Sequence, residues 1–217
     1  MEQPSKKRLL VFASGEKDGG GSGFKNLVES TYSGVLKAEV VGVISNIEDG
    51  GVARKALNLD IPFYYSPGET VQDYQTAVEL FKPDFNALSG WLKLVKGLDP
   101  TKTINIHPGP LPVFGGKDFY GHFVHEAVVE AFRMGEITHS AVTMHYVTEK
   151  FDDGPIIFEY PVKIEDDDTP ETLQKRVNGI EHAWQPYITN LVVTGQIAWD
   201  GKKVFIPNYV PLFIPHT

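Results

Sequence analysis

Short apolar runs alternate with stretches of helical periodicity along the first half of the chain. Residues 8–13 (RLLVFA) form a continuous apolar run, as expected for a strand that is buried on both faces of a parallel sheet. A helical pattern opens at Phe24, and the alternation then repeats. It predicts strands at 37–44, 61–65, 85–88 and 103–106 and helices at 52–57 and 69–81. This order is typical of βαβ units around a parallel sheet.

The second half of the chain predicts a different arrangement. Residues 119–132 have helical spacing, whereas residues 139–147 and 156–164 are typical of two strands joined by a turn, which favours an antiparallel pair. Thr169 and Pro170 begin a long helix, because a capping hydroxyl and a first-turn proline both favour a helix start. A short strand is expected around 204–206. We therefore predict one α/β domain over residues 1–217, with a Rossmann-like, mostly parallel twisted sheet, a C-terminal antiparallel strand pair and a long C-terminal helix.

The most distinctive stretch follows the last of the parallel strands. Asn105 and His107 alternate with Ile106, so on an extended backbone both side chains point the same way, about 7 Å apart. The prolines within residues 108–112 then end the strand and restrict the loop. A carboxamide and an imidazole on one rigid strand end could direct two donors at a single oxygen atom. A satisfied loop histidine beside a turn-forming asparagine would show the same spacing, so these residues alone leave both interpretations open.

A glycine-rich turn, residues 14–23 (SGEKDGGGSG), joins the first strand to the first helix. This arrangement presents bare backbone N–H groups to an anion at a helix N-terminus. The turn is not a P-loop, since no lysine precedes Ser22, and it lacks the third glycine of G-x-G-x-x-G. A flexible surface turn is the alternative. The turn, the loop from Gly90 and the Asn105 stretch all follow strands, so we expect them at one edge of the sheet.

Composition narrows the class of protein. The 217 residues carry a formal net charge of −8, which argues against a nucleic-acid surface, since that would need a basic stripe. There are no cysteines, so we expect neither disulfides nor thiolate chemistry. No apolar run has the length of a membrane span, and residues 1–8 are too short and polar for a signal peptide. These features predict a cytoplasmic enzyme with neither a nucleic-acid nor a membrane partner.

A metal site is the weakest of the candidate sites. His122 and His125 lie three residues apart on the helix predicted at 119–132, with Glu126 beside them. The spacing is not HExxH, and no third ligand is in evident reach. We therefore predict that no metal is bound.

Two motifs together carry a family resemblance. The stretch NIHPGPLP at residues 105–112 is followed by HYVTEKFDDGP at residues 145–155, and this combination resembles the folate-dependent formyltransferases. The resemblance runs over most of the chain, with similarity to the family's phosphate loop at 8–27, its folate-pocket segment at 90–95 and its last helix at 181–183. It implies transfer of a formyl group from 10-formyltetrahydrofolate to a small primary amine.

The acceptor amine is less clear than the chemistry. The resemblance favours glycinamide ribonucleotide, a phosphorylated amine of purine biosynthesis. A transferase acting on another amine, such as an amino sugar nucleotide, stays open as an alternative. So does a protein of another class, namely a formyltetrahydrofolate hydrolase or a folate-binding module without turnover. The sequence does not indicate an oligomeric state.

The resemblance also implies roles for individual residues. Asn105 and His107 would stabilise the oxyanion that forms when the amine attacks the formyl carbon. Asp152 would take the proton of the amine, whereas Asp153 suits a turn because it precedes Gly154. Residues expected to line the folate pocket are Leu92, Lys93, Leu94, Val147, Glu149 and Phe151. Residues expected to bind the acceptor are Gly21, Ser22 and Gly23 at its phosphate and Glu181 at a ribose hydroxyl.

The chain departs from the family pattern at three places. Gly23 stands where the family's phosphate loop has asparagine, and residues 16–20 lengthen that loop and add an acidic residue. Trp91 and Lys93 stand where the family's pocket segment usually has phenylalanine or tyrosine and arginine. Residues 113–121 form a longer loop than is usual. Because these departures fall on the acceptor side more than on the catalytic centre, the transfer chemistry is better supported than the identity of the amine.

Overall fold

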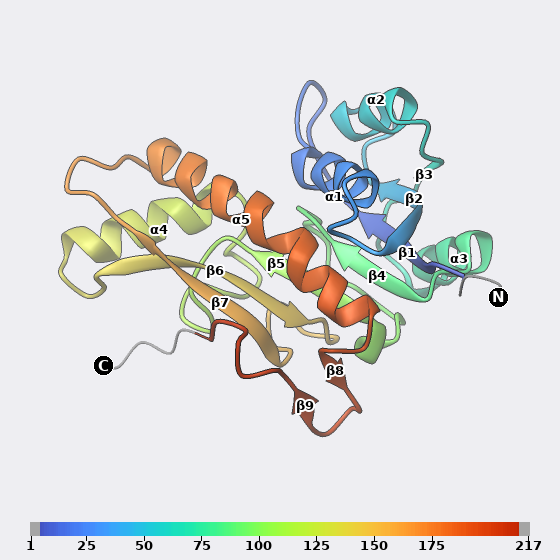
Figure 1. Cartoon of the computed structure of the whole chain (residues 1–217). Coiled ribbons are helices and arrows are strands. Elements are labelled where there is room, and N and C mark those ends of the chain that lie inside the picture. Colours follow the sequence, from blue (N-terminus) through green and yellow to red (C-terminus); the bar gives the residue numbers. More distant parts are fainter. Residues whose placement is uncertain (1–4, 213–217) are drawn as a thin grey trace.

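A seven-stranded sheet lies at the centre of the computed structural model, which describes residues 5–212 (Figure 1). The strand order is β3-β2-β1-β4-β5-β6-β7. The strands β3, β2, β1, β4 and β5 pair with one another in parallel, and β6 is antiparallel to both β5 and β7. The bounds are β1 Lys7–Phe12, β2 Ala38–Ser45, β3 Phe63–Tyr65, β4 Phe85–Leu88, β5 Thr103–His107, β6 His139–Tyr146 and β7 Ile156–Lys163. The predicted fold class, including the antiparallel pair, is confirmed.

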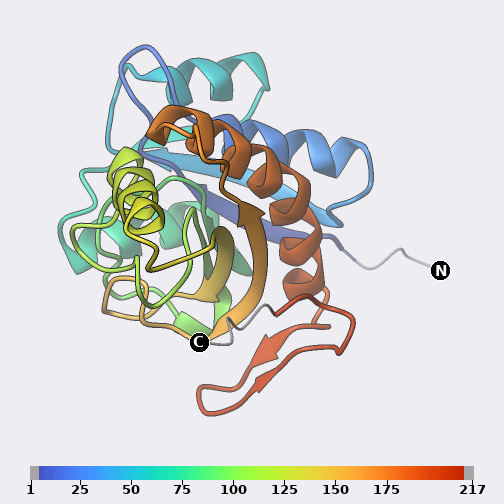
Figure 2. The same ribbon diagram turned by 90° about the vertical axis from the view of Figure 1, so that its left-hand side faces the viewer.

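Helices cover both faces of this sheet (Figure 2). In the described residues the α-helices are α1 Ser22–Tyr32, α2 Gly51–Asn58, α3 Val71–Phe81, α4 His122–Arg133 and α5 Pro170–Val193. A short 3-10 helix, η1, spans Pro100–Lys102, and a small hairpin is formed by β8 Ala198–Trp199 and β9 Val204–Phe205. The long C-terminal helix is thus confirmed as α5, which contacts α1, α4 and strands β5 to β7.

Strand β1 shows how the continuous apolar run serves two cores. Leu9 and Val11 pack into the larger core with buried residues of α1, α4 and α5. Leu10 and Phe12 point to the opposite face and pack against the buried side of α3. Since side chains alternate along a strand, only a run without polar interruptions can fill both cores at once.

Some element boundaries differ from the prediction for local reasons. Helix α4 begins at His122, three residues later than expected, because Gly121 with φ of 52° turns the chain immediately before it. The strand predicted at 61–65 is shortened to β3, since Pro62 has no N–H to donate to a ladder. The strand expected at 204–206 is β9, and its partner β8 was not predicted.

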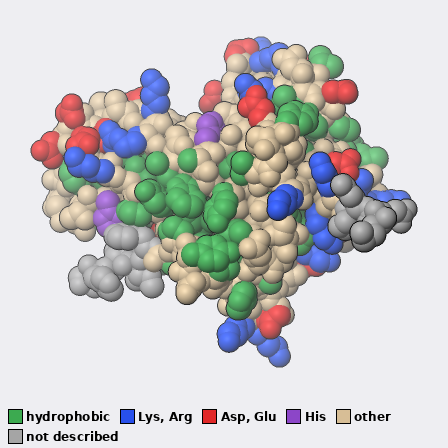
Figure 3. Space-filling view, in the orientation of Figure 1, with side chains coloured by type: hydrophobic (Ala, Val, Ile, Leu, Met, Phe, Trp, Pro, Cys, Tyr) green, Lys and Arg blue, Asp and Glu red, His purple; other side chains and the backbone are tan. Residues whose placement is uncertain are grey.

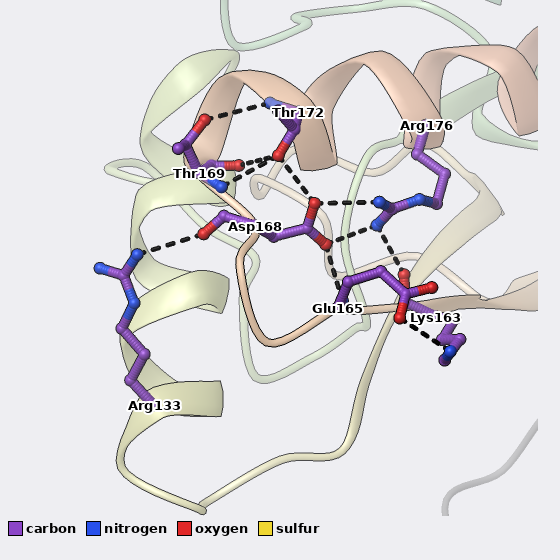
Figure 4. A network of polar contacts seen from close by, with 7 residues as sticks. All are labelled: Arg133, Lys163, Glu165, Asp168, Thr169, Thr172 and Arg176. Carbon is purple, nitrogen blue, oxygen red and sulfur yellow. Dashed lines mark hydrogen bonds and ion pairs between the residues drawn. The ribbon is translucent and has the colours of Figure 1, made fainter.

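Asp168 fixes the start of α5 (Figure 4). Its buried carboxylate accepts two hydrogen bonds from the Arg176 guanidinium, at 2.5 and 2.9 Å, and one from the Thr172 hydroxyl at 2.7 Å. Its backbone carbonyl accepts a hydrogen bond from Arg133 of α4 at 3.1 Å. Arg176 in particular holds the pKa of Asp168 well below its usual range. The first turns of α5 are therefore tied both to the preceding loop and to α4.

The surface seen in Figure 3 carries hydrophobic side chains in its middle, over β7 and α5. An aromatic group of Phe158, Tyr160 and Trp184 joins these two elements, with ring centroids 5.0 to 6.4 Å apart. Among residues 5–212, no helix is both long and apolar enough to cross a membrane.

Candidate active site

A cleft of about 720 Å³ opens where β1, β4 and β5 end. Such a volume is typical of sites for small ligands. Its walls include the glycine-rich turn, the loop that begins at Ser89, the end of β5 and the first turns of α4 and α5. The prediction that these three loops meet at one edge of the sheet is confirmed. In Figure 3 the outline of the molecule is indented between the parts that carry α4 and α1.

The end of β5 directs two polar side chains into this cleft. Ile104 and Ile106 pack in the larger core, so Asn105 and His107 point to the opposite face of the sheet. Both residues line the cleft, with Asn105 partly buried and His107 buried. The predicted shared direction of the two side chains therefore agrees with the structure.

Asp152 reaches the same place from the loop between β6 and β7. One carboxylate oxygen, Oδ1, accepts a hydrogen bond from Asn105 Nδ2 at 3.4 Å, and the other accepts one from the Gly116 N–H at 3.0 Å. Oδ2 also lies 3.7 Å from His107 Nδ1. Asp152 has a φ of 51°, so this aspartate adopts the left-handed turn conformation, while Asp153 faces Lys150 at 3.7 Å.

His145 completes the group, and the sequence analysis did not assign it a role. It lies directly across the antiparallel ladder from Asn105. Its Nδ1 donates to the Tyr146 carbonyl at 2.8 Å, which leaves Nε2 facing Asn105 Nδ2 at 3.1 Å and Asp152 Oδ1 at 3.4 Å. The available signal was its place at the start of the stretch 145–155, one of the two that carry the family resemblance.

The His107 ring is oriented by a backbone carbonyl. Nε2 lies 2.7 Å from the Phe114 oxygen, so this nitrogen donates and Nδ1 is the atom that faces Asp152. Burial lowers the pKa of His107, more than the nearby Asp152 carboxylate and Phe114 carbonyl raise it. The lowered pKa favours the neutral imidazole at neutral pH, and negative charge added beside the ring would favour its protonation.

The Asp152 carboxylate is kept ionised by the same neighbours. Burial alone would raise the pKa of Asp152, but the contacts of its carboxylate with the His145 and His107 rings and the hydrogen bond from the Gly116 N–H together bring it below its usual value. A partly buried carboxylate beside an imidazole can accept a proton and return it within one reaction cycle.

The glycine-rich turn leaves the N-terminus of α1 open to the cleft. Gly20 and Gly21 both have positive φ, at 77° and 72°, and no side chain caps the helix. Ser22 also contacts α5, through its hydroxyl, which lies 3.2 Å from His182 Nε2. Uncapped N–H groups at a helix start attract an anion.

The absence of a side chain at Gly23 is explained by the residues that lie next to it. A Cβ at this position would lie 2.2 Å from Ser89 Oγ and 3.2 Å from Gln185 Oε1. Those two side chains bind each other at 3.0 Å and are buried. The space that the family's asparagine would need is thus occupied in this chain.

Glu181 of α5 lines the same end of the cleft. Its carboxylate accepts a hydrogen bond from Asn178 at 3.2 Å. Burial raises the pKa of Glu181 to about 7, so the group changes charge near neutral pH and can either accept from or donate to a hydroxyl.

The residues expected to bind folate are divided between the cleft and its surroundings. Leu92 and Phe151 line the cleft, whereas the other four do not. Lys93 Nζ lies 4.0 Å from Glu69, and the Leu94 carbonyl accepts from the Tyr74 hydroxyl at 2.9 Å. Val147 is buried and Glu149 is exposed. The folate role of these six residues stays a prediction.

His125 is a cleft residue that the sequence analysis considered only as a metal ligand. It is buried, and its Nδ1 has no hydrogen-bond partner among the described residues. Burial lowers the pKa of His125 to about 4. His122 instead faces Glu126 and Glu171, at 3.2 and 3.6 Å. Within the described part of the chain no cluster of three or more His, Cys, Asp or Glu side chains could hold a metal ion.

Comparison with known proteins agrees with this geometry. The family model described as "Formyl transferase" matches residues 7–189. A chloroplastic phosphoribosylglycinamide formyltransferase from Arabidopsis thaliana is 34% identical over 213 residues, covering 92% of this chain and 70% of the relative. The phosphoribosylglycinamide formyltransferase of Bacillus subtilis is 32% identical over 193 residues, covering 84% of this chain and 92% of the relative.

A solved structure supports the same relationship. Glycinamide ribonucleotide transformylase 1 from Symbiobacterium toebii superposes with a TM-score of 0.80 at 26% identity, covering 94% of this chain and 95% of that one. The matched residues include the glycine-rich turn, the end of β5, the loop that carries Asp152 and most of α5. This chain therefore belongs to the formyl transferase family.

Proposed function

We propose that this protein transfers the formyl group of 10-formyltetrahydrofolate to the amine of glycinamide ribonucleotide, a step of purine biosynthesis. The convergence of Asn105, His107 and Asp152 in one cleft carries the proposal, since two strand-end donors and one carboxylate are what acyl transfer to an amine requires. The named relatives at 34% and 32% identity support the acceptor.

The three residues have distinct roles in this scheme. The amine nitrogen attacks the formyl carbon, a tetrahedral oxyanion forms, and the bond between that carbon and folate N10 then breaks. Asn105 Nδ2 donates a hydrogen bond to the oxyanion. His107 Nδ1, which lies beside Asp152, also donates to the oxyanion once this nitrogen carries a proton. Asp152 takes the proton of the attacking amine, directly or through a water molecule, for delivery to N10.

The two ligands would occupy different parts of the cleft. The N–H groups of Gly21, Ser22 and Gly23 at the start of α1 suit the acceptor phosphate, and Glu181 suits a ribose hydroxyl. Leu92 and Phe151, which both line the cleft, would form part of an apolar wall against the folate. No step in this scheme needs a metal ion.

Turnover of 10-formyltetrahydrofolate with a panel of amines tests the proposal. Glycinamide ribonucleotide should be formylated without release of formate, and a nucleotide-linked amino sugar should not react. Sulfate should compete with the acceptor and not with folate, because only the acceptor uses the helix N-terminus. Formate released from the folate in the absence of any amine would instead identify a hydrolase.

A further inference from the structure

The loop between β5 and α4 contacts two of the catalytic side chains through its backbone. The Phe114 carbonyl accepts a hydrogen bond from His107 Nε2 at 2.7 Å, and the Gly116 N–H donates one to Asp152 Oδ2 at 3.0 Å. The same carboxylate oxygen lies 3.7 Å from His107 Nδ1. Backbone groups that are close neighbours in one loop therefore hold both members of the His107–Asp152 pair.

Two glycines let this loop approach the carboxylate closely. A Cβ at Gly115 would lie 3.1 Å from Asp152 Cβ and 2.4 Å from a methyl group of Leu111. Gly116 has a φ of 106°, a backbone conformation that glycine adopts readily and other residues rarely do. The backbone at these two positions thus packs directly against Asp152.

The Phe114 side chain anchors the loop to the rest of the molecule. Its ring is 7% exposed, packs in the larger core and meets the Phe119 ring edge-on, with centroids 6.0 Å apart. Phe114 is the only buried residue within 112–118. The position of this ring therefore decides where the Phe114 carbonyl and the Gly116 N–H lie.

We propose that Phe114 is a positioning residue for formyl transfer, because its buried ring holds the loop where these two backbone groups meet His107 and Asp152. This inference rests on the proposed function, in which His107 and Asp152 carry out the chemistry. The hydrogen bond made by one ring nitrogen decides which nitrogen of a neutral imidazole carries the proton. When the Phe114 carbonyl is displaced, the proton of His107 moves to Nδ1 and is donated to Asp152. The carboxylate is then less able to take the proton of the amine.

Steady-state kinetics and nitrogen NMR of the ligand-free, histidine-labelled protein test this role, with His107→Gln assigning the His107 signals. Wild-type protein should show the neutral His107 ring protonated at Nε2, whereas Phe114→Ala should shift protonation toward Nδ1. In Phe114→Ala kcat should fall about 10- to 100-fold, because small displacements of reacting groups cost this much. The KM of each substrate should change by no more than about threefold, since ground-state binding is kept. Phe114→Leu, which keeps part of the buried volume, should lie between wild type and Phe114→Ala in both measurements.

Phe81→Ala is the matched control, since it removes the same ring at similar burial, 8% exposed, from the other core. It should lower the melting temperature as much as Phe114→Ala does and leave both kcat and the His107 ring unchanged. Equal losses of kcat in the two variants would overturn the inference, because they would indicate destabilisation alone.

A Phe114→Ala protein with the His107 ring state and kcat of wild type would overturn the inference as well. If this variant does not fold, Phe114→Leu decides in its place, with Phe81→Leu as its control, and wild-type values in Phe114→Leu would count against Phe114. Because the ring state is measured without folate or amine, a protein that fails to formylate glycinamide ribonucleotide can still show the Phe114 effect. The two proposals therefore fail separately.

Discussion

Replacing Asp152 with asparagine removes one charge from the centre of the site and keeps the shape of the side chain. Asparagine has the same shape, tolerates the left-handed backbone at φ of 51° and can still accept from the Gly116 N–H. What is lost is a negative charge 3.7 Å from His107 Nδ1, together with the long hydrogen bond that Oδ1 accepts from Asn105 Nδ2 at 3.4 Å. At an effective dielectric constant of roughly 20, a charge pair at this distance is worth about 4 kcal/mol.

That magnitude sets the expected loss of activity. Without the carboxylate, the protonated imidazole that meets the oxyanion is about 4 kcal/mol less stable, which corresponds to roughly a thousandfold in turnover. The amide also cannot accept the proton of the amine. Asp152→Asn should therefore lower kcat about a thousandfold, while its melting temperature stays within a few degrees of that of wild type.

Asp153→Asn is the matched control. Asp153 lies 3.7 Å from Lys150 Nζ, and both side chains are more than half exposed, so this pair contributes at most about 1 kcal/mol. The variant should keep most of its activity. A turnover assay and a thermal melt of both variants suffice. An inactive Asp153→Asn, or an Asp152→Asn that retains a tenth of wild-type turnover, would refute the assignment of Asp152.

Three further predictions concern the oxyanion donors, the start of α5 and a buried acid. Asn105→Ala and His107→Ala should each lower turnover by hundreds-fold, which corresponds to about 3–4 kcal/mol of transition-state stabilisation. Folate binding should be retained in a direct titration. A variant with near wild-type turnover would exclude the replaced residue as an oxyanion donor. Asp168→Ala should lower the free energy of unfolding by about 3 kcal/mol in urea melts, because it leaves Arg176 without its buried partner; a loss below about 1 kcal/mol would mean that the pair is not a stabilising contact. Burial on β7 raises the pKa of Glu159 to about 7, so its neutral form stabilises the fold below about pH 4.5 and this contribution is lost as the pH rises through 7. Glu159→Gln should therefore melt above wild type at pH 8 but not at pH 5, and equal melting differences at both pH values would contradict the raised pKa.

Local sequence determined the order of the helices and strands and the direction in which Asn105 and His107 point. Apolar runs fix strands and 3.6-residue spacing fixes helices, and their alternation leaves few topologies other than a parallel sheet with crossover helices. Once β5 is a strand, the two-residue period places Asn105 and His107 on one face. These features depend only on neighbouring residues.

Tertiary structure decided everything that depends on residues distant in the chain. His145 meets Asn105 only because β6 pairs with β5 in one particular register, and a shift of one residue would turn it to the other face. Asp152 reaches His107 because Gly116, from another loop, holds its carboxylate. Likewise, the sequence shows an acidic residue in the glycine-rich turn, but only the packing of that turn on α2 places Glu16 in the cleft. Loop conformations follow from such contacts and not from local propensity, which is why the sequence defined the chemistry of the site but not its geometry.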